Sequence, residues 1–274
     1  MSKNRQYSID DLINLMARLR EPETGCPWDL QQSYATIVPS TLEEAYEVAD
    51  AIETGDFDHL KEELGDLLFQ VIFYSQLGQE EGRFNFSGIV NNLVTKLVRR
   101  HPHVFPEGTL ESRIEPGRER DETQIKAKWE ALKQEERQQK GKRGTLDDIP
   151  TNLPALTRAA KLQKRAAGAG FDWPEIAGVF DKIDEEVDEV KQAVQEGGQG
   201  ALTEEIGDLL FAVVNASRHL KIDPEAALRA ANRKFERRFR GVEEGLQARG
   251  LTPAEASLGV MDNLWDEVKK QEKQ

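Results

Sequence analysis

The residues with the clearest chemical potential in this chain are carboxylates spaced three positions apart. Glu44 and Glu47 form one such pair, and Glu63 and Asp66 form another. Residues three apart lie on the same side of an α-helix. If the two helices pack together, the four carboxylates converge, and their combined charge of about −4 is strongly repulsive at short range. Raised pKa values, nearby cations or a bound metal must then compensate this charge.

The donor atoms of these side chains favour a hard cation. Oxygen ligands without histidine suit Mg²⁺, with Mn²⁺ as a possible substitute, rather than zinc or iron. A di-iron helical bundle would need Glu-x-x-His motifs, and none of the four histidines follows a glutamate in that register. The alternative is a solvated acidic face whose carboxylates pair with cations one helical turn away.

The same pattern occurs a second time, 142 residues further along the chain. Between residues 43–69 and 185–211, 14 of 27 positions are identical. The second copy repeats the four carboxylates as Glu186, Glu189, Glu205 and Asp208. The recurrence of two motifs at one spacing favours a ligand set over a solvated face. The repeated module spans roughly 120–130 residues, which is too long for a solenoid repeat.

Each carboxylate pair adjoins an apolar stripe on its helix. With 100° of rotation per residue, residues 45, 48, 49 and 52 lie beside Glu44, and residues 64, 67, 68 and 71 lie beside Glu63. We expect the apolar stripes to pack together and the acids to meet at the edge of the shared core. Gly65 and Gly207 precede the two aspartates, and each suggests the close approach of another helix or a ligand.

Basic and aromatic residues near the C-terminus are candidates for binding an anionic ligand. Lys234 and Arg238 lie four residues apart, as do Trp265 and Lys269. Because magnesium often shares its ligands with phosphate oxygens, these cations could contact phosphates and Trp265 could stack on a base. The same residues could instead be a charged helix face and a core tryptophan. The sequence has no phosphate-binding glycine loop of the P-loop type.

The elements that must position these residues are helices. Apolar residues at helical spacing predict an all-α chain of two tandem antiparallel helical bundles. The expected helices span residues 9–20, 41–53, 60–77, 87–100 and 124–138 in the first copy, and 155–167, 175–196, 202–220, 224–248 and 253–271 in the second. Ser40 with Glu43 fits a capping box, and Gly55 and Gly197 fit left-handed helix ends.

The two copies are expected to form separate domains. Residues 139–149 are polar and punctuated by glycine, which is typical of a linker, so we predict domains at 1–138 and 150–274. The first copy also contains an insertion, residues 106–121, rich in Gly, Pro and charge, which predicts a loop.

The composition excludes several classes of protein. The chain has 274 residues, a net charge of −13 and a single cysteine. One cysteine rules out a disulfide framework and cysteine-rich metal sites, and the acidic balance disfavours nucleic acid as a partner. We expect no membrane association and a cytoplasmic location, because no signal peptide or spanning segment is evident.

The combined motifs resemble the all-α nucleoside triphosphate pyrophosphohydrolases, and most closely the MazG family. The resemblance rests on Gly25-Cys-Pro-Trp-Asp, Leu42-Glu-Glu-Ala-Tyr-Glu and Glu62-Glu-Leu-Gly-Asp-Leu-Leu-Phe in the first copy. In the second copy it rests on Lys234-Phe-Glu-Arg-Arg-Phe and on Trp265 with Lys269. It covers nearly the whole chain.

This resemblance implies magnesium-dependent hydrolysis of nucleoside triphosphates to monophosphate and pyrophosphate, with broad base tolerance and a role in nucleotide-pool housekeeping. It also implies a homodimer whose bundles are completed across the interface. By motif, Glu186, Glu189, Glu205 and Asp208 would bind metal, and Lys234, Arg238, Trp265 and Lys269 would contact nucleotide. The second copy would be the catalytic one. The first copy retains its carboxylates but has Arg99-Arg-His-Pro-His where the second has Arg237-Arg-Phe-Arg-Gly.

The motifs leave alternatives for the proton acceptor and for the functional class. Glu185 or Glu204, beside the ligands on the same arc, is the candidate proton acceptor or hydrogen-bond partner of a ligand. A different functional class also fits the motifs, namely a sensor or adaptor in which one or both copies bind a nucleoside triphosphate without turnover.

Overall fold

The computed structural model describes residues 6–115, 117, 121–139 and 144–272. Every regular element in these residues is a helix, and none is a strand, which confirms the all-α prediction. The chain divides into two compact units, Met1–Gln134 and Glu135–Gln274. The division falls inside α6 (Glu122–Gln139), a few residues before the expected linker at 139–149, part of which lies outside the described residues. No described helix is both long enough and apolar enough to cross a membrane.

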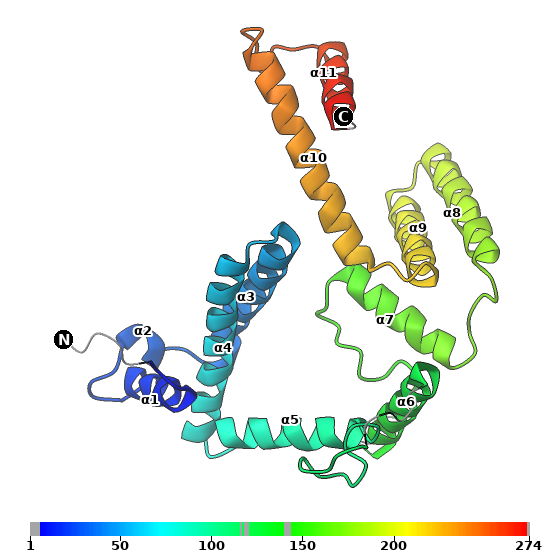
Figure 1. Ribbon diagram of the computed structural model, residues 1–274. Helices are drawn as coiled ribbons and strands as arrows, with labels where there is room; N and C mark the ends of the chain where they lie inside the picture. The colour runs from blue at the N-terminus through cyan, green and yellow to red at the C-terminus, as the bar shows by residue number, and fades with distance from the viewer. Residues whose placement is uncertain (1–5, 116, 118–120, 140–143, 273–274) are drawn as a thin grey trace. The chain divides into compact units, whose positions relative to one another are not determined.

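The first unit is organised around an antiparallel helical hairpin (Figure 1). The hairpin consists of α3 (Tyr34–Thr54) and α4 (Phe57–Glu80). Gly55 joins them with φ of +77°, the left-handed end predicted from the sequence. Helix α1 (Ile9–Leu19) packs on α4 and supplies Met16 to a core with Ile37, Ile72, Phe73 and Leu77. Short α2 (Pro27–Leu30) and α5 (Phe86–Arg100) complete the unit with most of α6.

The expected capping box at Ser40 is wrong, because α3 begins at Tyr34, seven residues before the predicted start at residue 41. Ser33 caps this helix, accepting a hydrogen bond from the Thr36 amide at 3.4 Å, and Ser40 lies in the helix interior. The helix also runs through Pro39, which cannot donate a backbone hydrogen bond. Ile37, 2% exposed, sits in the core of the unit, and this burial explains why the first turns stay helical.

The second unit contains two antiparallel helix pairs. Helices α8 (Ile176–Glu196) and α9 (Gln199–His219) form a hairpin, joined after Gly197 with φ of +76° as predicted. Helix α7 (Ala155–Gly168) packs on α9. Helices α10 (Pro224–Gln247) and α11 (Leu258–Gln271) form the second pair, whose core contains Val242, Leu246 and Leu264 (Figure 1). Helix α11 begins five residues later than the sequence predicts.

The prediction that the apolar stripes pack together with acids at the edge is also wrong for the single chain. Leu64 is 49% exposed and Leu210 53% exposed, whereas Glu63 and Glu186 are only 7% and 4% exposed. The helices of each hairpin therefore turn a buried carboxylate inward and leave part of the apolar stripe uncovered. The other helix of the hairpin does not cover this part of the stripe.

Candidate active site

In the first unit, three of the four predicted carboxylates come together. Glu44 from α3 meets Glu63 and Asp66 from α4, with one carboxylate oxygen of each lying within 4.8 Å of the others. We call these residues the first carboxylate group. The antiparallel crossing of the hairpin causes the convergence, because the three-residue spacing keeps Glu63 and Asp66 on one face of α4.

The second unit repeats this arrangement on its own hairpin. Glu186 from α8 meets Glu205 and Asp208 from α9, again with oxygens within 4.8 Å of one another. These residues are the second carboxylate group. Two hairpins of the same chain thus bring corresponding side chains into the same kind of cluster.

The fourth carboxylate of each copy, Glu47 or Glu189, lies outside these tight groups but interacts with them electrostatically. Burial, followed by repulsion from Glu186, raises the pKa of Glu189. In the first unit, burial and then the nearby charge of Glu47 raise the pKa of Glu63. Both residues therefore lie close enough to their groups to interact with them electrostatically.

Crowding of negative charge also contributes to a raised pKa in the first carboxylate group. Burial raises the pKa of Glu44, and repulsion from Asp66, Glu47 and Glu63 raises it further. Like charges at this separation disfavour the ionised state of each partner. A divalent cation placed among these oxygens would reverse the effect.

The second group contains a buried atom that points to a missing partner. Among the described residues, Glu186 Oε2 has no hydrogen-bond partner, although its residue is only 4% exposed. A buried carboxylate oxygen without a hydrogen bond is costly even where the other oxygen is paired, because the desolvation of that oxygen is not compensated. Its setting beside Glu205 and Asp208 fits a hard divalent metal held by oxygen ligands.

Sequence reasoning missed the basic residue that accompanies each buried glutamate. In the second unit, Lys182 Nζ lies 2.6 Å from Glu186 Oε1 and 2.9 Å from Glu185 Oε1. In the first, His59 Nδ1 lies 3.1 Å from Glu63 Oε1. Both basic residues precede their glutamate by four residues, a spacing that a search for i,i+4 pairs would have found.

The candidate proton acceptors are more exposed than Glu186 and Glu205 of the second carboxylate group. Glu185 is paired with Lys182 and its side chain is 57% exposed, and Glu204 is also exposed. Neither belongs to the second carboxylate group, nor do Glu43 and Glu62 belong to the first. These residues border the groups along the helix without entering them.

The predicted nucleotide contacts form a separate cluster on α10 and α11. The Arg238 guanidinium carbon lies 5.8 Å from the centre of the Trp265 ring, and Phe235 packs against the same ring at 5.3 Å. Lys269 is paired with Asp266 at 2.7 Å, and Lys234 is exposed. The structure therefore brings Arg238 and Trp265 together but holds them on a helix pair other than α8–α9.

The corresponding aromatic residue of the first copy is Trp129. Lys133 Nζ lies 4.2 Å from the centre of its ring, and the His101 ring lies at 5.9 Å. A cation and an aromatic residue thus accompany the tryptophan in both units, with histidine in the first unit where phenylalanine occurs in the second.

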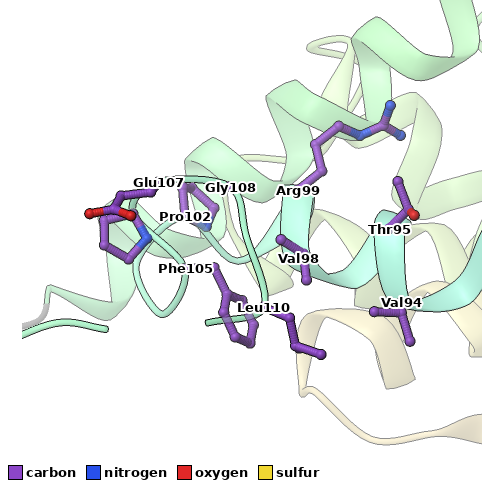
Figure 2. A pocket seen from close by; sticks show the side chains of 10 residues that line it. Val94, Thr95, Val98, Arg99, Pro102, Phe105, Glu107, Gly108 and Leu110 are labelled. Carbon is purple, nitrogen blue, oxygen red and sulfur yellow. The ribbon is translucent and has the colours of Figure 1, made fainter. Parts of the chain in front are cut away.

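A cavity of about 620 Å³ lies in the first unit, between the end of α5 and the following loop. Figure 2 shows Val98, Phe105 and Leu110 gathered on its apolar side, while Arg99 and Glu107 point away from them. None of the predicted ligands or nucleotide contacts lines it. Part of its wall, residues 106–110, belongs to the predicted insertion, of which residues 116 and 118–120 lie outside the described chain.

Comparison with known proteins shows the family of this chain. The MazG nucleotide pyrophosphohydrolase domain matches residues 32–105 and again residues 178–242, and these two stretches contain both carboxylate groups. A nucleoside triphosphate pyrophosphohydrolase of Escherichia coli (strain K12) is 54% identical over 268 residues, which cover 96% of this chain and 98% of the relative.

A second relative, the nucleoside triphosphate pyrophosphohydrolase/pyrophosphatase MazG of Thermotoga maritima, is 40% identical over 95% of both chains. The uncharacterized protein YabN of Bacillus subtilis is 41% identical over 97% of this chain, which covers 53% of that protein. With two family domains, each built around a converging set of carboxylates, this chain is an enzyme of the MazG nucleotide pyrophosphohydrolase family.

Proposed function

We propose that this protein hydrolyses nucleoside triphosphates to monophosphate and pyrophosphate with Mg²⁺, tolerates different bases and serves nucleotide-pool housekeeping. The observation that carries this proposal is the second carboxylate group, in which buried Glu186 has one unpartnered oxygen next to Glu205 and Asp208. The names of the E. coli and T. maritima relatives supply the substrate class.

Glu186, Glu205 and Asp208, joined by Glu189, would hold the metal in the second unit. When bound, Mg²⁺ supplies positive charge that stabilises the phosphate oxygens and acidifies a water molecule. Oxygen donors alone surround this position, which suits Mg²⁺ and also Mn²⁺. In the first unit Glu44, Glu47, Glu63 and Asp66 would hold a metal in the same way.

The remaining residues would bind the substrate and handle the proton. Lys234, Arg238 and Lys269 would contact the phosphates, and Trp265 would stack on the base, which explains tolerance because every base offers a flat face. Glu185 or Glu204 would accept the proton of the attacking water or orient a ligand. Glu185 is paired with Lys182 at 2.9 Å, which makes its carboxylate less available to accept a proton. We therefore favour Glu204 as the proton acceptor.

We also propose that the functional form is a homodimer, because both hairpins leave an apolar row uncovered. Leu64, Leu68 and Val71 on α4 are exposed at spacings of four and three residues, and the second copy repeats the row as Ile206, Leu210 and Val213 on α9. Contiguous exposed apolar rows are unusual on monomers. A second copy of this chain offers a matching surface by two-fold symmetry. Sedimentation velocity should give a dimer, and Leu68→Glu with Leu210→Glu should shift it toward monomer.

The central test is a pyrophosphate-release assay with the full-length protein, MgCl₂ and each of the common ribo- and deoxyribonucleoside triphosphates. Monophosphate and pyrophosphate should appear in equal amounts, and chelation of the metal should stop the reaction. Asp188→Asn on α8, an exposed carboxylate paired with Lys191 at 2.8 Å, is a matched control and should behave as the wild type. Tight nucleotide binding without product over hours would instead favour a sensor or adaptor.

A further inference from the structure

A single carboxylate just past the end of α11 is held between two guanidinium groups of α10. Glu272 Oε1 accepts hydrogen bonds from Arg237 Nε at 3.0 Å and from Arg237 Nη2 at 2.8 Å. Its other oxygen, Oε2, accepts a hydrogen bond from Arg238 Nε at 2.8 Å and lies 2.8 Å from Arg238 Nη2. Hydrogen bonds from Arg238 and Arg237 lower the pKa of Glu272, so this carboxylate stays ionised at neutral pH.

The close packing of α10 and α11 makes this contact possible. A Cβ added at Gly245 would lie 2.5 Å from Leu264 Cδ2, and one at Gly241 would lie 2.8 Å from Val268 Cγ2. The two helices therefore approach each other more closely than larger residues at these two positions would allow. Because the helices are antiparallel, the pairs 245–264 and 241–268 continue in register to Arg238 and Glu272 (Figure 1).

Glu272 uses only one edge of the Arg238 guanidinium. Arginine carries N–H donors on three nitrogens, and here Nε and Nη2 face Glu272 while the Trp265 ring lies 5.8 Å from the central carbon. Among the described residues, Arg238 Nη1 has no hydrogen-bond acceptor, so its donors can serve a ligand. A planar guanidinium fixed on two sides loses less rotamer freedom when it binds a phosphate.

The local charge balance remains suited to an anion. Two guanidinium groups surround one carboxylate, so a positive charge is left over where Glu272 meets the middle of α10. Lys234 adds another, one helical turn before Arg238. Glu272 therefore orients the two arginine side chains without neutralising their combined positive charge.

The same spacing recurs in the first copy of the sequence. Glu272 follows Trp265 by seven residues, and Glu136 follows Trp129 by seven. The paired arginines recur three and four residues after their lysine, Lys96 in the first copy and Lys234 in the second. The glutamate thus belongs to the duplicated pattern that also carries the nucleotide contacts.

We propose that Glu272 is a positioning residue for nucleotide binding, which holds Arg238 beside Trp265 and presents the free edge of its guanidinium to the phosphates of the substrate. The proposal rests on the proposed function, because Arg238 acts there as a phosphate contact.

Steady-state pyrophosphate release from ATP with MgCl₂ tests this role in the full-length protein. We expect Glu272→Gln to raise KM about 5- to 10-fold and to leave kcat within about 2-fold, since a charge-assisted bidentate contact is weakened away from the reacting phosphorus. Glu267→Gln is the matched control, because this exposed glutamate of α11 has its cation, Arg249, at 3.8 Å and lies outside the cluster. It should match the wild type.

A double-mutant cycle sharpens the assignment. In an Arg238→Ala background, Glu272→Gln should have little further effect on KM, because the two residues act as one unit. Independent, additive effects would overturn the proposal. So would a decrease in KM, which would identify Glu272 as a competitor of phosphate, and so would a loss of kcat together with a lower melting temperature, which would identify a purely structural role. A wild-type protein that releases no pyrophosphate would refute the proposed function itself, and this positioning role with it.

Discussion

The two carboxylate groups contain corresponding residues, but they bury different ones. In the first unit the buried member is Glu63, on the second helix of its hairpin, and in the second unit it is Glu186, on the first helix. The accompanying basic residue changes as well, from His59 to Lys182. A buried charge needs a local partner, and each copy supplies one from the helix that carries its own buried glutamate.

This difference bears on how each site behaves without metal. Hydrogen bonds to Glu186 and then Glu185 raise the pKa of Lys182, so the second unit has a permanent counter-cation. His59 compensates Glu63 only when it is protonated. Burial, and then repulsion between neighbouring carboxylates, raises the pKa of Glu44 and Glu63 in the first unit and of Glu189 in the second. The two sites therefore share one carboxylate pattern but differ in the basic residue beside it.

The largest predicted effect separates the two units by activity. Asp208→Asn should lower kcat by about 100-fold or more, because a metal ligand stabilises transition-state charge by several kcal/mol. The corresponding change in the first unit, Asp66→Asn, should cost far less if the second unit is the catalytic one. Pyrophosphate release measures both, with circular dichroism to verify folding. Equal losses would show that the two units share the catalysis.

The second-largest predicted effect is thermal stabilisation of the protein by bound metal. Mg²⁺ at 100 times its Kd should add about 2.7 kcal/mol of stability to a unit that binds it only when folded. Calorimetry should show this shift for the wild type, and Glu186→Gln should remove the part that belongs to the second unit. A wild-type melting profile that does not respond to Mg²⁺ would contradict metal binding at either group.

The raised pKa values predict a pH dependence of stability without metal. A carboxyl whose pKa is higher in the folded chain than its ordinary value of 4.5 contributes stability below pH 4.5. This contribution is lost as the pH rises through 4.5 and then through the folded pKa. With chelator present, Glu44→Gln should therefore gain stability relative to the wild type as the pH rises from 4 toward neutral. Urea unfolding at a series of pH values measures the difference, and a constant difference would contradict it.

The smallest predicted effect concerns the glycines beside the aspartates. A Cβ at Gly65 or Gly207 would meet no described atom of this chain within 4 Å. Replacing a mid-helix glycine by alanine should then raise the free energy of unfolding by up to about 1 kcal/mol. If a second copy or the substrate approaches these positions, Gly65→Ala or Gly207→Ala will weaken dimerisation or raise KM in spite of this gain. Chemical denaturation and sedimentation separate the two effects.

Sequence periodicity predicted most of the fold because helix formation depends on local spacing. The antiparallel hairpins and their left-handed ends at Gly55 and Gly197 follow from residues a few positions apart. The start of α3 could not be predicted in this way. It depends on the burial of Ile37 against Met16 and Phe73, residues from two other helices.

The amino-acid sequence by itself determines the helices, the duplication and the identity of the carboxylates, since each follows from residue types and their spacing along the chain. Only the tertiary structure decides which carboxylate of each set is buried and that Glu272 pairs with two arginines. Those outcomes depend on the rotation and closeness of helices packed across the chain, where small displacements decide whether a charged group meets water, a partner or neither.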